Sequence, residues 1–354
     1  MTSTPATDRL YEIDGAAVRV RADHPLVGRG LDNIFSYFGF TPSATASGSG
    51  LVALDFLTSE PAFGIPSAAT EEARFGGVTV WDAGRELYLS AGASVARLDP
   101  GSATGVAAVE LSPWVRPERL EDDPVSLVVL ALTLLLRHRD LYGIHAAALA
   151  WQGAGCLFVA DGRAGKSTMS LNLLQQGWEY VSDDFVFLRP SDGRVEAVAL
   201  RRNLCIGRAA ICDFPELRGH WRARPFAGSS KQWLQMSELY PRQVREACVP
   251  RVLIFPELVR EPRSRLSPLT DKAEILGRLM HQSRLLVLEP RMSGRHLDIL
   301  KRLILQSSCY RLRAGRDLKT PSHLISHLLK PLLSASWPHA QASTPDALPF
   351  DSCS

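Results

Sequence analysis

The sequence has few cysteines and no arrangement of them that would form a metal site. Its six cysteines are scattered among 354 residues, with no C-x-x-C pair and no His/Cys cluster at metal-binding spacing. We therefore expect reduced thiols. The first residues lack the basic and apolar stretches of a signal peptide, and the longest apolar run, Val125 to Leu136, is too short to cross a bilayer. These absences predict a cytoplasmic protein with no membrane partner.

Strong charge is also missing. The formal net charge is +3, and no window combines clustered Lys and Arg with interleaved aromatic residues. This pattern argues against a nucleic-acid partner. The apolar content of 45% and the charged content of 22% are typical of a globular protein that buries a core. At about 150 residues per domain, the length predicts two domains.

Residues 1–121 are rich in strand patterns. Segments such as AAVRVRA and SVARLD alternate apolar and polar residues and are joined by turns that contain Gly, Asp or Ala. No motif in this part carries chemistry. We expect a β-rich N-terminal domain that either has a structural role or recognises the molecule on which the rest of the chain acts.

The pattern changes at residue 122, where we expect a second domain over residues 122–330. DDPVSLVVLALTLLLRHRD predicts a buried helix with an acidic start and a basic end. Apolar runs around QGAG predict a hairpin, STMSLNLLQQG predicts a helix that stops at Gly177, and WEYVSDDFVFLRP predicts one further strand. Alternating strands and helices indicate an α/β domain. Residues 331–354 have the composition of a disordered tail.

The stretch ADGRAGKST nearly matches the phosphate-binding pattern G-x-x-x-x-G-K-[ST], with Ala160 in place of the first glycine. Such a loop binds phosphate through backbone N–H groups, a lysine and a helix N-terminus, and its hydroxyl holds Mg²⁺. Alone, the stretch could equally be a turn of small residues before a helix. The strand before it and the helix after it favour a nucleotide site. The candidate binding residues are Asp161, Gly162, Arg163, Ala164, Gly165, Lys166, Ser167 and Thr168.

Two acidic residues and one histidine are the candidate partners of this loop. Asp183 and Asp184 follow the apolar segment WEYVS. If a strand continues through them, their side chains point to opposite faces, so one can hold Mg²⁺ with Ser167 and the other can accept a hydroxyl proton. The alternative is a solvated turn. A lone histidine such as His145 is usually structural, but pairing within the hairpin would place it near the loop.

Together these residues resemble the HPr kinase/phosphorylase family and its kinase-only relatives, whose core is similar to that of PEP carboxykinase. The family pattern is a His-bearing strand, a loop of the type G-D-S-G-x-G-K-S and an Asp-Asp pair. Here His145 lies 21 residues before Lys166, and Asp184 lies 18 residues after it. The resemblance covers roughly residues 130–190 and implies an α/β core with a P-loop.

The resemblance also implies roles and partners. Lys166 would bind the phosphates of ATP, Ser167 and Asp183 would hold Mg²⁺, Asp184 would accept the proton, and His145 would support Asp184. The acceptor would be a Ser-type hydroxyl on a small protein or on a ribosomally made peptide such as a lasso-peptide precursor, and a homo-oligomer is expected. Two alternatives stay open: a kinase of free serine or a sugar, and a nucleotide-binding module without catalysis.

The sequence departs from the family pattern at several positions. Ala160 and Arg163 replace glycines, so we expect a negative φ at both. The metal-contacting Glu of the family has no secure counterpart, because Glu216 in the segment ELRG lies too far along the chain. Cations that clamp the transferred phosphate are expected near the loop. The candidates are Arg201, Arg202, Lys231, Arg313 and Arg316.

Overall fold

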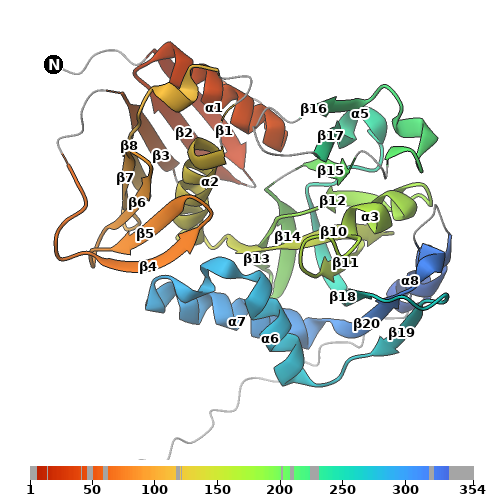
Figure 1. Ribbon diagram of the computed structural model, residues 1–354. Helices are drawn as coiled ribbons and strands as arrows, with labels where there is room; N and C mark the ends of the chain where they lie inside the picture. Colours follow the sequence, from red (N-terminus) through yellow and green to blue (C-terminus); the bar gives the residue numbers. More distant parts are fainter. Residues whose placement is uncertain are drawn as a thin grey trace, which may run out of the picture.

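The structure, a computed structural model, describes residues 6–13, 15–40, 42–45, 51–58, 63–116, 120, 122–200, 202–207, 211–223, 231–318 and 323–334. Within these residues the chain is a mixed α/β protein with two large sheets and one small sheet (Figure 1). No helix in these ranges is long and apolar enough to span a bilayer.

The N-terminal sheet has eight strands among the described residues, in the order β1-β2-β3-β8-β7-β6-β5-β4. Residues along β3 and β7 alternate between buried and more exposed, so one face of the sheet is covered. Helices α1 (Pro25–Phe38) and α2 (Asp122–Arg137) cover that face and share its core. The strands are β1 (Thr7–Ile13), β2 (Ala16–Ala22), β3 (Leu51–Leu57), β4 (Thr70–Phe75), β5 (Val78–Asp82), β6 (Leu87–Ala91), β7 (Ser94–Asp99) and β8 (Thr104–Ala108).

The predicted helix after residue 121 is confirmed as α2. Its apolar side chains pack on the N-terminal sheet, so the predicted domain boundary at residues 121/122 falls between elements that share one core. The division into two domains stays a prediction.

The central sheet follows the order β12-β10-β11-β18-β14-β13-β9, with β20 paired to β18 and β19 paired to β20. Strands β11, β18 and β20 are mutually parallel, so their carboxyl ends meet at one edge of the sheet. The strands are β9 (Tyr142–Ile144), β10 (Ala146–Trp151), β11 (Ala154–Val159), β12 (Glu179–Ser182), β13 (Val186–Ser191), β14 (Arg194–Ala199), β18 (Ala247–Leu258), β19 (Arg265–Pro268) and β20 (Ser308–Ala314).

Helices cover both faces of the central sheet. Alternate residues of β10 belong to two different cores, one shared with α3 (Lys166–Leu174) and α8 (Leu324–Ser334), the other with α6 (Lys272–Gln282) and α7 (Pro290–Gln306). Figure 1 shows α6 and α7 along one side of the sheet and α3 on the other. Because β10 is buried from both sides, its sequence is a continuous run of small and apolar residues.

Two local predictions in this region are confirmed. β10 and β11 form the expected hairpin, with Gln152 and Gly153 at positive φ in its turn. The helix α3 also stops where expected: Gly177 has a φ of 81°, and the N–H of Trp178 bonds back to the carbonyl of Leu173 at 3.2 Å. This is the glycine stop that the sequence indicated.

Two predictions are corrected. The segment WEYVSDDFVFLRP is not one strand, because β12 ends at Ser182, β13 starts at Val186, and the two strands pair with different neighbours. The expected tail begins later than predicted, since α8 continues to Ser334. The rest of that tail lies outside the described residues.

A small sheet stands beside α3 and joins the two halves of the chain. It consists of β15 (Asn203–Gly207), β17 (Lys231–Gln235) and β16 (Trp221–Ala223), in that order. Tyr37 of α1 contacts it twice: its hydroxyl lies 2.8 Å from the sulfur of Cys205, and its ring centroid lies 5.6 Å from that of Trp233. The N-terminal half thus packs directly on the small sheet.

His296 on α7 is buried without a hydrogen bond. Its exposed fraction is 0%, and neither ring nitrogen has a partner among the described residues. Its ring packs 5.2 Å from that of Tyr142. Burial, together with the nearby charge of Arg137, lowers the pKa of His296 to about 3. Because an unfolded histidine has a pKa of about 6.5, the unfolded state binds the extra proton between these two values.

We therefore expect stability to fall as the pH falls below about 6.5, with a contribution from His296 of about 2 kcal/mol at pH 5. The measurement is the free energy of unfolding in urea at pH 7 and pH 5, for the wild type and for His296→Leu. The variant should lose less stability between the two pH values. Equal losses would mean that other groups control the acid sensitivity.

Candidate active site

The candidate loop, residues 160–165, connects the end of β11 to the start of α3 at the edge of the central sheet where parallel strands end. Gly165 precedes the helix with a φ of 83°, a conformation that only glycine adopts without strain. No side chain caps the first turn of α3. The helix N-terminus is therefore open toward the loop, as anion binding requires.

Lys166 is the centre of the site. Its exposed fraction is 6%, and its amine donates to the carbonyl oxygens of Ala160 at 2.6 Å and Asp161 at 3.0 Å. The same nitrogen lies 2.9 Å from Nε2 of His145. Burial lowers the pKa of Lys166, and the carboxylates of Asp184 and Asp183 partly offset this effect. The structure thus brings together four of the residues that the sequence singled out.

The two aspartates have different surroundings, although they lie in a bend rather than in a strand. Asp183 is only 2% exposed, and its carboxylate accepts hydrogen bonds from Ser167 at 2.9 Å and, through its other oxygen, from Ser170 at 3.5 Å. Asp184 is on the outer side, with a side chain 36% exposed. The two carboxylates thus differ in burial, although both line the same cavity over the loop.

Asp184 and His145 form a pair. Oδ1 of Asp184 lies 3.5 Å from Nδ1 of His145, and the other ring nitrogen of His145 faces Lys166. The histidine is positioned by its backbone, whose N–H bonds to the carbonyl of Gln282 at 2.9 Å. A carboxylate beside an imidazole is suited to accept a proton from a hydroxyl group.

A cavity of about 220 Å³, here called the loop cavity, lies over this site. The small sheet supplies its far wall through three residues of β15 and through Lys231 of β17. Its lining residues are Gly162, Arg163, Gly165, Lys166, Ser167, Thr168, Asp183, Asp184, Cys205, Ile206, Gly207 and Lys231.

Of the cations proposed as phosphate clamps, Lys231 lines the loop cavity. Its charge adds to the effect of burial in lowering the pKa of Lys166. Arg202 instead stacks on Phe40, and Arg313 pairs with Glu261. Arg201 lies outside the described residues. The backbone N–H of Arg316 bonds to the backbone carbonyl of Glu261, the residue with which Arg313 pairs. The sequence contained no signal that favours Lys231 over the other candidate cations, because a separate sheet brings it to the loop.

Glu216 does not reach the site. Its carboxylate accepts hydrogen bonds from Gln175 at 2.5 Å and Tyr240 at 3.3 Å, beyond the carboxyl end of α3. Among the described residues, no group of three or more His, Cys, Asp or Glu side chains could hold a metal ion. Any divalent cation at Ser167 and Asp183 would therefore share its coordination with phosphate oxygens and water, as Mg²⁺ commonly does.

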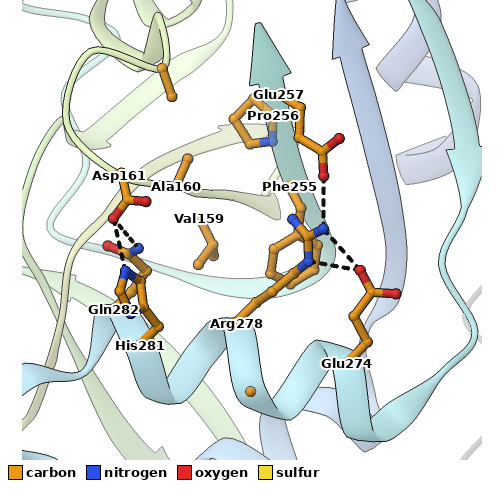
Figure 2. Close-up of a pocket in the computed structure, with 12 residues that line it drawn as sticks. Val159, Ala160, Asp161, Phe255, Pro256, Glu257, Glu274, Arg278, His281 and Gln282 are labelled. Carbon is orange, nitrogen blue, oxygen red and sulfur yellow. Dashed lines mark hydrogen bonds and ion pairs between the residues drawn. The ribbon is translucent and has the colours of Figure 1, made fainter.

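Helix α6 contributes to the site in a way that was not predicted from the sequence. Oδ1 of Asp161 lies 2.9 Å from the amide nitrogen of Gln282 and 3.1 Å from Nε2 of His281, which ties the loop to the end of that helix (Figure 2). The hydrogen bond from Gln282 is the main reason that the pKa of Asp161 is lowered. Nothing in the sequence indicated these contacts, since the partners are about 120 residues apart.

Comparisons with known proteins add little to this geometry. No protein-family model matches the chain, and no curated protein matches it. Among solved structures, the chain is similar to the Hpr(Ser) kinase/phosphatase from Coxiella burnetii, with 14% identity and a TM-score of 0.27, over 54% of this chain and 92% of that one. A likeness of this size does not show a shared activity.

The expectation of a negative φ at Arg163 is wrong. Arg163 adopts a φ of 69°, whereas Ala160 is not among the residues with positive φ. The side chain of Arg163 is exposed and lines the loop cavity together with Lys166 and Lys231. The backbone at Arg163 is thus strained, and the side chain at this position adds a third cation to the lining of the loop cavity.

We expect Arg163→Ala and Arg163→Gly to weaken ADP binding by a similar factor, because both remove the charge. Only the glycine variant relieves the strain, so it should be more stable than the alanine variant by about 1 kcal/mol. ADP titration and thermal unfolding of both variants measure these effects. Unchanged affinity in both variants would show that the side chain of Arg163 does not contact the phosphates.

Proposed function

We propose that this protein is an ATP- and Mg²⁺-dependent kinase that transfers the γ-phosphoryl group to a hydroxyl group. The observation that carries the proposal is the buried amine of Lys166, held at the loop between His145 and two carboxylates. A buried lysine at the start of a helix, next to an acid–imidazole pair, matches the needs of phosphoryl transfer. Simple structural stabilisation would not require this set of groups in one place.

Ser167 and Asp183 fit the requirements of a Mg²⁺ site. They supply hard oxygen ligands, and the buried carboxylate of Asp183 accepts hydrogen bonds from the hydroxyls of Ser167 and Ser170. When bound, the cation would neutralise charge on the phosphate oxygens. Ser170 contacts the other oxygen of Asp183 at 3.5 Å, a long and therefore weak hydrogen bond, and it is not part of the proposed ligand set.

Lys166 and the residues around it then have separate roles in phosphoryl transfer. The acceptor oxygen attacks the γ-phosphorus and forms a new O–P bond, while the bond from the γ-phosphorus to the bridging oxygen breaks and ADP leaves. The acceptor proton passes to the carboxylate of Asp184, which His145 orients at 3.5 Å. Lys166 exchanges its bonds to the loop carbonyls for phosphate oxygens and stabilises their charge.

We propose a Ser-type hydroxyl as the acceptor, on a small protein or peptide or on a small molecule such as free serine or a sugar. Use of ATP and the reduced thiols are consistent with a cytoplasmic site of action. The competing proposal is a nucleotide-binding module without catalysis. It is supported by the strained backbone at Arg163, where the loop departs from the usual glycine.

Lys166→Ala should weaken ADP binding by about tenfold or more, because it removes the cation that reaches the phosphates. Asp184→Asn should leave ADP binding close to that of the wild type but reduce turnover about 10²- to 10⁴-fold, because only the proton acceptor is lost. Isothermal titration with ADP and assays of ADP release measure the two effects.

The exposed Lys301 on α7 provides the control, and Lys301→Ala should match the wild type in both assays. ADP binding that is unaffected by Lys166→Ala would contradict the assignment of the loop. Wild-type protein that binds ATP but transfers phosphate to no acceptor or to water would favour the module without catalysis.

Ser167→Ala and Asp183→Asn should raise the Mg²⁺ concentration needed for half-maximal binding of a fluorescent ADP analogue, by about tenfold. Ser170→Ala is the matched control, because Ser170 also bonds to Asp183 but is not proposed as a ligand. It should leave the Mg²⁺ dependence near that of the wild type. Equal shifts in all three variants would indicate a structural role for this hydrogen-bond group.

A further inference from the structure

A second cavity, of about 430 Å³, lies on the other side of the loop (Figure 2). We call it the α6 cavity; it is bounded by the first loop residues, by the ends of β11 and β18, and by one side of α6. Its volume is in the range of pockets that enclose small ligands or single side chains of a partner. The loop cavity and the α6 cavity therefore flank the phosphate loop from two sides.

The α6 cavity adjoins the end of the loop where the γ-phosphate would lie. Ala160 and Asp161 line it, and their carbonyl oxygens hold the amine of Lys166, the group that reaches the β- and γ-phosphates. Thr168, one residue beyond Ser167 along α3, instead lines the loop cavity. A nucleotide that extends along α3 occupies the loop cavity and leaves the α6 cavity beside its terminal phosphate.

The α6 cavity is linked to the histidine–aspartate pair through Gln282. Gln282 lines the cavity, and its backbone carbonyl accepts a hydrogen bond from the N–H of His145, the partner of Asp184. Asp184 itself lines the loop cavity, so a hydroxyl group that enters from the α6 side reaches past the loop toward Asp184 and the terminal phosphate. Phosphoryl transfer requires this placement, because the attacking oxygen must align with the bond that breaks.

The carboxylates of the cavity lie at opposite walls, each beside polar partners (Figure 2). At one wall, Arg278 bonds to Glu257 at 2.7 Å and to Glu274 at 2.9 Å, and Arg311 also bonds to Glu274. These two glutamates are thus matched by two guanidinium groups. At the other wall, Asp161 is bound by the amide of Gln282 and the ring of His281, without an arginine.

Asp161 is therefore a carboxylate of the cavity that has no guanidinium partner among the described residues, and the nearby charge of Lys166 acts on it. Its side chain is 71% exposed, and its pKa is lowered, chiefly by the hydrogen bond from Gln282, so that it is ionised at neutral pH. Between the walls, Val159 and Phe255 supply apolar surface, with the guanidinium of Arg278 stacked 5.7 Å from the Phe255 ring. An occupant that suits this lining has apolar carbons and donates hydrogen bonds, and an acidic occupant is disfavoured.

We propose that the α6 cavity receives the phosphoryl acceptor, and that this acceptor carries a positively charged amine close to the hydroxyl that is phosphorylated. The amine faces Asp161, and the hydroxyl faces Asp184. This inference rests on the proposed kinase function. Two kinds of acceptor have an amine close to a hydroxyl group: a small amino sugar or amino alcohol, and a peptide in which a serine is next to a lysine.

Gly277 offers a way to block the cavity without disturbing the fold. It lies on α6 at the cavity wall, and a Cβ atom added there would meet nothing within 4 Å. Leucine also has a higher helix propensity than glycine, so Gly277→Leu should fold at least as well as the wild type. Gly294→Leu on α7 is the matched control, because this exposed helical glycine also has open space and lies outside the cavity.

The test measures binding by saturation-transfer NMR in the presence of ADP and Mg²⁺. One series of probes is glucosamine, glucose and glucuronate, and the other is a pair of capped tetrapeptides, Gly-Ser-Lys-Gly and Gly-Ser-Glu-Gly. In at least one series the amine-bearing probe should bind saturably and about fivefold or more tightly than its acidic counterpart, the factor expected for one ion pair. Gly277→Leu should abolish this binding, whereas Gly294→Leu should retain it.

The series that binds identifies the source of the acceptor. The proposal is overturned if no probe binds saturably, if the acidic probes bind as well as the amines, or if Gly277→Leu leaves binding unchanged. Each of these results concerns the acceptor site alone. A failure of the proposed kinase function would be seen in a different measurement, as ADP binding that does not depend on Lys166. Affinity for the fluorescent ADP analogue should be the same in both leucine variants.

Discussion

The site depends on the burial of one positive charge. An ammonium group with 6% exposure loses most of its hydration, so it must find oxygen partners inside the protein. Lys166 finds them in two carbonyl groups of its own loop and in the field of Asp183 and Asp184. The hydrogen bonds from the amine hold the loop around it, and the histidine and the two aspartates lie close to the same amine. The same groups form the candidate phosphate site.

The central sheet explains how residues far apart in the chain reach this amine. β11, β12 and β18 all end at one edge, while β10 begins there, because β10 is antiparallel to β11 and β12. Consequently the loop, the Asp-Asp bend, His145 and the lining of the α6 cavity lie at the same edge. Ligand sites of α/β proteins commonly occupy this position at the carboxyl ends of strands.

The small sheet couples the N-terminal half to the site. Cys205 lines the loop cavity, and its sulfur contacts the hydroxyl of Tyr37 on α1. Trp233, on the strand that carries Lys231, packs against the same tyrosine ring. Two contacts of Tyr37 thus connect α1 to the strands that form the wall of the loop cavity.

The sequence by itself determined the local elements and the identity of the central residues. The hairpin, the glycine at the end of α3 and the strands of the N-terminal sheet follow from turn chemistry and from hydrophobic periodicity, which act over a few residues. The lysine, the histidine and the two aspartates were identified by type and spacing, and the structure brings them together.

Tertiary structure alone decided the rest. It broke the expected strand at Asp183, placed Arg163 in a left-handed conformation, and brought Lys231 to the loop cavity, unlike the other candidate cations that the structure describes. It also brought α6 against Asp161 to form the second cavity. These features depend on contacts between segments that are distant in the chain, and local sequence patterns carry no information about which distant segments will meet.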